Sequence, residues 1–188
     1  MNSRLFIENI DTEEALLRIS HTEDIAVARG FSNANRRCET LAWRAIVRRE
    51  LGEGVTISYD EYGAPQVDVD GKFISVSHSR GVVAVLIADG ECAVDIEHAE
   101  RDFGRVAERY LSPTEVKIAE QYNLYAEMWC AKEALYKLYK KGGVDLVKDL
   151  VIAEYRRENS CFVATIFCGE PIEIEIRREG PLAIAKIG

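Results

Sequence analysis

Two groups of charged residues have types and spacings suited to chemistry on phosphates. In the first group, Asp95 and Glu97 alternate with Val94 and Ile96, a pattern typical of a β-strand, in which residues two apart share one face. Both carboxylates then point the same way. Carboxylates are ligands for Mg2+, which is commonly bound together with the phosphates of a substrate. The alternative is an ordinary half-solvated strand with its polar residues outward.

The second group lies on a helix predicted further along the chain. Glu133 and Lys137 are four residues apart, so they occupy one face of this helix, with the acid on the N-terminal side. Lys132 directly precedes Glu133, and Trp129 lies one turn before it. Taken alone, Glu133 and Lys137 also suit a surface ion pair that has no part in any chemistry.

A histidine near the end of an upstream strand completes the pattern. His78 stands between Ser77 and Ser79, and a protonated imidazole donates hydrogen bonds from both nitrogens. A histidine beside a turn is also common as a surface residue without a function. Lysine and histidine neutralise phosphate charge, so the three groups together indicate phosphate chemistry at a metal ion.

The order and spacing of these groups resemble those of the 4'-phosphopantetheinyl transferases of the surfactin-synthetase-activating type. That family has a Ser-His-Ser strand end, a Gly-(Ile/Val)-Asp-x-Glu strand and a Trp-x-x-Lys-Glu-x-x-x-Lys helix, in this order. The chain has all three, with Ala93 in place of the usual glycine. Weaker matches are the turn at 62–65, where Ala64 replaces a lysine, and the segment 109–115. The likeness covers residues 31–146.

The resemblance implies an α+β fold of two similar α/β halves, related by a pseudo-two-fold axis, with the active site at their interface. It implies a holo-[acyl-carrier-protein] synthase that moves 4'-phosphopantetheine from coenzyme A to a serine of an acyl or peptidyl carrier protein. Adenosine 3',5'-bisphosphate would be released. The carrier would belong to fatty-acid, polyketide or non-ribosomal peptide synthesis or to a lysine pathway.

The resemblance also assigns roles to single residues. It implies that Asp95, Glu97 and Glu133 hold Mg2+, and that Glu133 is a metal ligand, the general base for the serine, or both. Lys137 and Lys132 would stabilise the charge that develops on the phosphates, and Glu133, Lys137 and Asp95 are the expected catalytic residues. The residues expected to contact coenzyme A are His78, Ser77, Lys132, Lys137, Arg37 and Pro65, with Arg36 as the rival of Arg37.

Composition limits the other function classes. The net charge of −8 and the pI of about 5.1 argue against a nucleic-acid binder, because such affinity comes mainly from basic residues. They argue equally against a metal-dependent phosphodiesterase or nuclease, which is one alternative. A non-catalytic binding domain of the same fold is another. No apolar run approaches the length of a membrane span, and the five cysteines show no Cys-x-x-Cys pair. We expect a cytoplasmic monomer with reduced thiols.

The patterning divides the chain into two halves, 1–90 and 91–188, each with helices and strands. A continuous apolar run at 82–88 predicts a central strand, and Asp70-Gly71 predicts a hairpin between strands at 66–69 and 73–77. A capping box is predicted at Ser112 and Glu115. The other predicted helices are 12–19, 33–51, 103–110 and 124–141, and the other predicted strands are 55–59, 92–97, 150–155, 161–168, 171–177 and 182–187.

Overall fold

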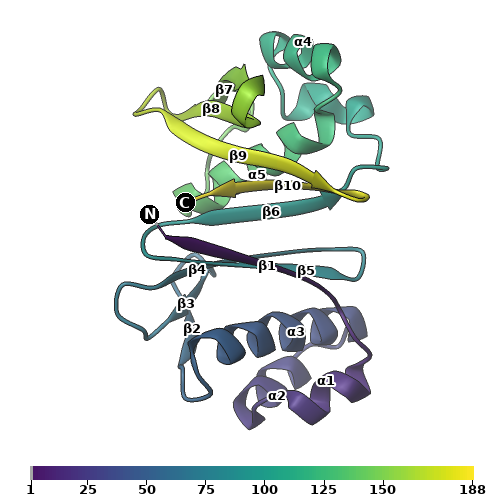
Figure 1. Cartoon of the computed structure of the whole chain (residues 1–188), viewed down its shortest axis with the longest axis vertical. Coiled ribbons are helices and arrows are strands. Elements are labelled where there is room, and N and C mark those ends of the chain that lie inside the picture. The colour runs from purple at the N-terminus through teal and green to yellow at the C-terminus, as the bar shows by residue number, and fades with distance from the viewer. Residues whose placement is uncertain (1) are drawn as a thin grey trace. The chain divides into compact units, whose positions relative to one another are not determined.

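The computed structural model describes residues 2–188, which form two compact units, residues 2–91 and Cys92–Gly188. Each unit has its own helices, strands and hydrophobic core (Figure 1). The mixture of helices and antiparallel sheets agrees with the predicted α+β class. None of the helices in residues 2–188 combines the length and the apolar character that crossing a membrane requires.

The first unit is built on a three-stranded antiparallel sheet in the order β1-β5-β4. Its central strand is the predicted apolar run, and every residue of it after Val82 is buried. The elements of this unit are β1 (Ser3–Asn9), α1 (Glu13–Ile19), α2 (Thr22–Arg29), α3 (Ala34–Leu51), β2 (Ile57–Tyr59), β3 (Pro65–Val67), β4 (Phe73–Ser79) and β5 (Val82–Ala88).

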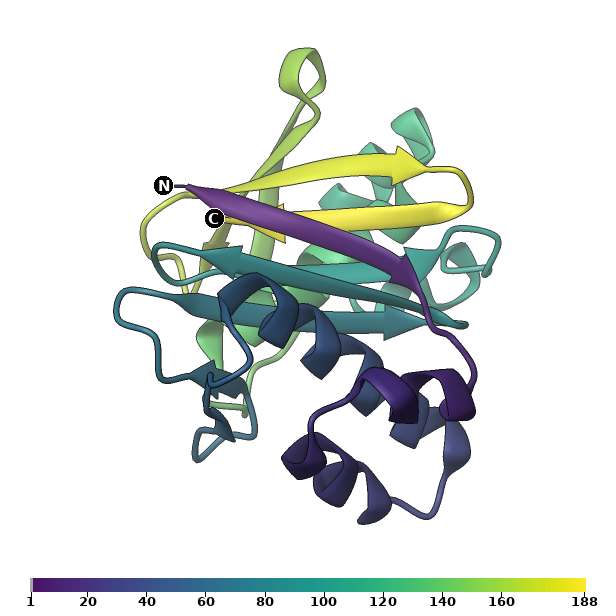
Figure 2. The same ribbon diagram turned by 60° about the horizontal axis from the view of Figure 1, so that its bottom comes forward.

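Helix α3 covers one face of this sheet, and α1 and α2 pack on α3 (Figure 2). The helix begins where the side chain of Asn33 accepts a hydrogen bond from the backbone N–H of Arg36 at 3.1 Å, and it ends at Gly52, whose φ of 111° suits glycine. Its buried stripe and the facing side chains of β5 form one core, which includes Leu41, Ile46, Val47, Val83, Val85 and Ile87.

Two features of the first unit differ from prediction. Strand β1 and helix α2 were not predicted at all, and the hairpin expected around Asp70-Gly71 is wrong. The chain does turn there, but β3 pairs with β2, and β4 pairs with β5. The cause is Asp60, whose carboxylate accepts the backbone N–H groups of Tyr62 at 2.9 Å and Ala64 at 2.8 Å. This Asx-type turn closes the β2–β3 hairpin instead.

The second unit has a five-stranded antiparallel sheet in the order β6-β10-β9-β8-β7. The four strands predicted in the tail are confirmed, and β6 joins them by pairing with β10. The elements of this unit are β6 (Ala93–His98), η1 (Gly104–Arg109), α4 (Pro113–Tyr122), α5 (Tyr125–Tyr139), β7 (Leu150–Arg156), η2 (Arg157–Asn159), β8 (Cys161–Ile166), β9 (Ile172–Glu179) and β10 (Leu182–Ile187).

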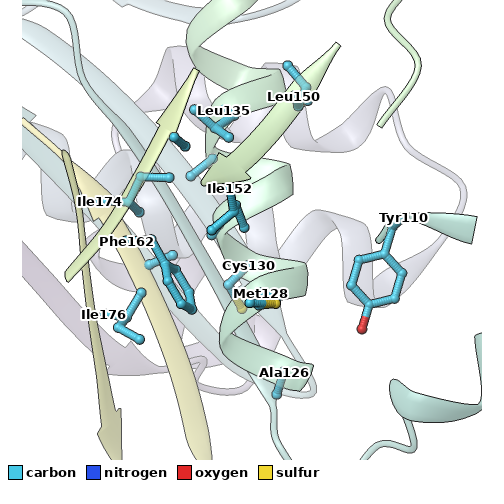
Figure 3. Packing of buried hydrophobic residues seen from close by; sticks show 14 of the residues in the cluster. Tyr110, Ala126, Met128, Cys130, Leu135, Leu150, Ile152, Phe162, Ile174 and Ile176 are labelled. Carbon is cyan, nitrogen blue, oxygen red and sulfur yellow. The ribbon is translucent and has the colours of Figure 1, made fainter. Parts of the chain in front are cut away.

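Helix α5 packs on the sheet of the second unit and presents a completely buried face to it. Figure 3 shows side chains of α5 beside apolar side chains from the strands. The labelled residues of this core include Met128, Cys130 and Leu135 on the helix, and Ile152, Phe162, Ile174 and Ile176 on the strands. The core therefore fixes α5 against the strands that lie beneath it.

The helix ends of the second unit agree only in part with those predicted from the sequence. The capping box is confirmed, because Glu115 Oε2 accepts from the Ser112 N–H at 2.7 Å and Ser112 Oγ accepts from the Glu115 N–H at 3.3 Å. The helix predicted at 103–110 is a 3-10 helix. Helix α5 ends at Lys140, which has a φ of 66°, before the glycine pair that was expected to end it. Both units place a helix over an antiparallel sheet, and a pseudo-two-fold relation between them stays a prediction.

Candidate active site

Strand β6 places two carboxylates on its helix-facing side. Asp95 and Glu97 share a face with Ala93, which belongs to the core under α5. The contact with the helix is direct, because Lys137 of α5 lies within hydrogen-bonding distance of Asp95. Burial raises the pKa of the Cys130 thiol well above its usual range, and the negative charges of Asp95 and Glu97 act in the same direction. The carboxylates therefore lie where β6 meets α5.

Helix α5 supplies an acid and a base to the same place. Cys130, Glu133 and Lys137 follow one another at spacings of three and four residues, which is one face of a helix. Lys137 Nζ donates to Asp95 Oδ1 at 2.7 Å and to the Val94 carbonyl at 2.9 Å. The alternative interpretation, a Glu133–Lys137 surface pair, is not what the structure shows, because Lys137 forms an ion pair with Asp95 between helix and strand.

Glu133 lies among charges that disfavour its own ionisation. Its pKa is raised above the ordinary value, first by burial and then by the negative charges of Asp95 and Glu97, while Lys137 partly offsets them. Within residues 2–188, its carboxylate makes no hydrogen bond or ion pair; Lys137 is engaged with Asp95 instead. A carboxyl group with a raised pKa is suited to accepting a proton near neutral pH.

Glu97 is more exposed than Asp95, with 20% of its side chain accessible against 9%. It forms a long ion pair with Arg101, at 3.4 Å, and the Arg101 side chain is more than half exposed. In the part of the chain that the structure describes, no three His, Cys, Asp or Glu side chains are gathered closely enough to hold a metal ion by themselves. The donors nevertheless fit Mg2+, which prefers carboxylate oxygens, keeps several waters and needs few protein ligands. A divalent cation would also relieve the repulsion that raises the pKa of Glu133.

Lys132 does not lie with these residues, and its predicted contact with coenzyme A needs correction. Its side chain is fully buried, and Nζ donates to Glu115 Oε1 at 2.5 Å, to the Leu146 carbonyl at 2.9 Å and to the Leu150 carbonyl. An ammonium group has three N–H donors, and these three partners use all of them. Lys132 has no donor left for a phosphate.

A second charged group lies in the first unit, on α3 and β4. Arg36 Nη1 lies 2.8 Å from His78 Nε2, and Glu39 Oε1 lies 3.3 Å from His78 Nδ1. Arg36 also reaches Glu39 at 3.5 Å. Half of the Arg36 side chain and a third of that of His78 are exposed. The guanidinium and the imidazole therefore remain accessible to an anionic ligand, with Glu39 as the carboxylate that such a ligand would displace.

Arg37, which the sequence favoured over Arg36, is engaged elsewhere. Its guanidinium binds both carboxylate oxygens of Glu13, at 2.6 and 3.0 Å, and donates to the carbonyls of Phe31 and Ser32. The hydrogen bond to Glu13 raises the pKa of Arg37 further above its ordinary value. These contacts tie α1 to α3, so Arg36 is the better candidate for a phosphate contact.

Two further arginines of α3 do not contribute to a basic surface. Arg44 and Arg48 are buried and share the buried carboxylate of Asp24, with Arg44 Nε to Oδ1 at 2.6 Å and Arg48 Nε to Oδ2 at 2.5 Å. The two arginines lower the pKa of Asp24 although its burial alone would raise it. This network joins α2 to α3, so Arg44 and Arg48 have a structural role.

The remaining predicted contacts with coenzyme A lie on two strands of the first unit. Ser77 is buried on β4, and His78 beside it points to the opposite face, because neighbouring strand residues alternate. Pro65 opens β3 directly after the turn that Asp60 closes. The roles of Ser77 and Pro65 toward coenzyme A stay predictions.

Sequence reasoning missed two residues that organise these groups. Glu115 was recognised as a capping residue, but its second oxygen also holds Lys132 and the backbone N–H of Ile152, at 2.8 Å. Glu39 lies one helical turn after Arg36, a spacing that could have indicated their pairing. The partner of Glu115 had no comparable sequence signal, because Lys132 is 17 residues further on.

Residues 91–185 match the sequence model of the 4'-phosphopantetheinyl transferase superfamily. This match spans 95 of the 188 residues, about half of the chain, and it contains the complete group on β6 and α5. It does not reach Arg36, Pro65 or His78. No curated protein matches the chain.

Proposed function

The chain belongs to the 4'-phosphopantetheinyl transferase superfamily, and we propose that it transfers 4'-phosphopantetheine from coenzyme A to a serine of an acyl or peptidyl carrier protein. The observation that carries this proposal is the meeting of β6 and α5, where Asp95, Glu133 and Lys137 form one charged group. This group lies entirely within the matched residues.

In this reaction, the serine oxygen forms a bond to the phosphorus that carries the pantetheine arm. The bond from that phosphorus to the oxygen of adenosine 3',5'-bisphosphate breaks. We assign the serine proton to Glu133, because its raised pKa and its lack of a hydrogen-bond partner within residues 2–188 suit a proton acceptor. Lys137 is the cation that can balance charge developing on the phosphate oxygens.

The carboxylates Asp95, Glu97 and Glu133 are the residues we propose to hold Mg2+. A bound magnesium ion would neutralise phosphate charge and orient the diphosphate for in-line attack. Asp95 is kept in place by Lys137, and Glu97 by Arg101. The sequence left Glu133 as ligand, base or both, and we propose both roles; a Glu133→Gln variant separates them.

Arg36 and His78 are the residues of the first unit that we propose to contact a phosphate of coenzyme A. Their exposure and their mutual proximity support this role. A phosphate would take the place of Glu39 as the anionic partner, with stronger charge-assisted hydrogen bonds. Lys132 and Arg37 are not proposed as phosphate contacts. All three donors of Lys132 have partners within the fold, and Arg37 is held in a bidentate pair with Glu13 and donates to two backbone carbonyls.

The test is mass spectrometry of an apo carrier protein incubated with this protein, coenzyme A and Mg2+. We expect the carrier to gain the mass of one phosphopantetheine group, and a carrier with its acceptor serine replaced by alanine to gain nothing. Cleavage of coenzyme A without a mass gain on the carrier would indicate a phosphodiesterase. Binding of coenzyme A without either product would indicate a non-catalytic domain.

A further inference from the structure

Lys132 and Glu115 form a buried ion pair that joins four segments of the second unit. The lysine comes from α5 and the glutamate from the first turn of α4, and their side chains are 0% and 1% exposed. Lys132 also binds the carbonyls of Leu146 and Leu150, which precede and begin β7. Charges so deeply buried are tolerated only when their hydrogen-bonding capacity is used.

Glu115 is saturated in the same way. One oxygen accepts from Lys132 and from the backbone N–H of Ile152 on β7, at 2.8 Å. The other accepts from the backbone N–H of Ser112 at the start of α4, at 2.7 Å. The carboxylate therefore fixes the beginning of α4, the middle of α5 and the first residues of β7 to one point.

The Lys132–Glu115 pair adjoins the proposed site along α5. Lys132 and Glu133 are neighbours on α5, and a step of one residue along a helix turns the side chain to a different side. Lys132 points to α4 and β7, while Glu133 lies among Asp95, Glu97 and Lys137. A shift or rotation of α5 at Lys132 would therefore displace Glu133 and Lys137 together.

We propose that Lys132 and Glu115 are positioning residues, which set the place and rotation of α5 so that Glu133 and Lys137 meet Asp95. The proposal rests on the proposed function, since it concerns the same reaction. It differs from a phosphate contact of Lys132 in one measurable respect. A phosphate contact acts on the affinity for coenzyme A, whereas displacement of a reacting group acts on turnover at saturating substrate.

The main variant is Glu115→Gln combined with Lys132→Met. It removes both buried charges at similar size, a change that folded proteins often tolerate better than the loss of one partner. We expect the affinity for coenzyme A to stay within about twofold and kcat to fall roughly ten- to hundredfold, because small displacements of reacting groups have effects of this order. Hydrogen exchange in residues 125–139 should become faster. Lys117→Met, on the exposed side of α4, is the control and should change none of these quantities.

Two results would overturn the proposal. One is a tenfold or larger loss of affinity for coenzyme A with unchanged hydrogen exchange in α5, which would show that Lys132 contacts a phosphate of coenzyme A. Normal kcat with normal α5 exchange would show that the pair has no effect on the site. If the double variant does not fold, Glu115→Asp retains both charges, shortens the tie by one methylene group and is judged by the same measurements. Should the wild-type protein load no carrier, the proposed function fails, while affinity and hydrogen exchange still decide the role of Lys132.

Discussion

The two charged groups of this protein differ in how much water surrounds them. In the second unit, Asp95 is only 9% exposed at its side chain, and its ion pair with Lys137 is partly withdrawn from solvent. In the first unit, the group formed by Arg36, His78 and Glu39 is open, with Arg36 52% exposed. Charges interact more strongly where water is excluded. We therefore expect the first group to govern binding and the second to govern the reaction itself.

The largest expected effect comes from Glu133→Gln. Removal of one preorganised electrostatic group lowers turnover by roughly 10²–10³ in comparable sites, and we expect a loss of this size in carrier loading. The melting temperature should stay equal or rise, because a neutral amide at this position is not repelled by Asp95 and Glu97. Turnover and melting are measured on the same preparation. A folded variant that loads the carrier at the wild-type rate would remove Glu133 from the mechanism.

The same variant separates the two roles of Glu133. Magnesium affinity is measured by calorimetry in the presence of coenzyme A and without a carrier protein, so that no reaction occurs. A ligand role predicts weaker binding of Mg2+ to Glu133→Gln, because Mg2+ loses a carboxylate. A base role alone predicts normal affinity with lost turnover. Asp95→Asn is the reference, since it removes a proposed ligand that has no proton-transfer role.

In the open group, His78→Ala and Arg36→Ala should each weaken the binding of coenzyme A by roughly tenfold, the loss expected for one charge-assisted hydrogen bond of about 1.5 kcal/mol. Turnover at saturating coenzyme A should change little, because a contact made equally in ground and transition states affects only affinity. Arg37→Ala is the matched control. It breaks the bidentate pair with Glu13, so it should lower the melting temperature and leave the affinity unchanged.

The opposite pattern would reverse our choice between the two arginines. If Arg37→Ala weakens the binding of coenzyme A and Arg36→Ala does not, the assignment made from the sequence was correct. Isothermal titration of both variants at two salt concentrations tests this directly. Exposed charge contacts weaken as ionic strength rises, so the wild-type affinity should fall with salt, and the affinity of Arg36→Ala should fall less.

Glu133 also predicts a smaller effect, on the pH dependence of stability. Its pKa is raised in the folded protein, so the folded state holds this proton more tightly than the unfolded state does. This tighter proton binding by Glu133 adds to the free energy of unfolding. The contribution is complete below the ordinary pKa of 4.5 and is lost as the pH rises from that value through the pKa of the folded state. In a chelating buffer, the stability of Glu133→Gln relative to wild type should therefore increase over this window and then level off. A constant difference across the window would contradict the raised pKa.

The sequence predicted what depends on neighbours along the chain. The capping box at Ser112, the apolar strand at 82–88 and the shared face of Asp95 and Glu97 all follow from local spacing, and the structure confirms them. The helix predicted around Trp129 and Lys137 is also confirmed, although it ends earlier than its glycines suggested.

The sequence could not predict which residues, far apart along the chain, pair with one another in the fold. Lys132 had the motif position of a phosphate ligand, but its charge is satisfied by Glu115 and by carbonyls of another segment. Arg37 and Arg36 are neighbours with the same chemistry, and only the packing of α1 against α3 brings Glu13 to one of them. The failed hairpin at Asp70 has the same origin, since Asp60 closes a competing turn.

The smallest expected effect among the three acids is that of Glu97→Gln. The Glu97 side chain is 20% exposed against 9% for Asp95, and its ion pair with Arg101 is long, at 3.4 Å, so water can replace its oxygen more easily than that of Asp95. We expect turnover to fall less than in Asp95→Asn, and excess Mg2+ to recover most of the loss, because Mg2+ accepts water in its coordination shell. Turnover measured against Mg2+ concentration in both variants gives the comparison. A loss in Glu97→Gln that equals the loss in Asp95→Asn and resists excess Mg2+ would show that Glu97 is as important to the reaction as Asp95, although its side chain is more exposed.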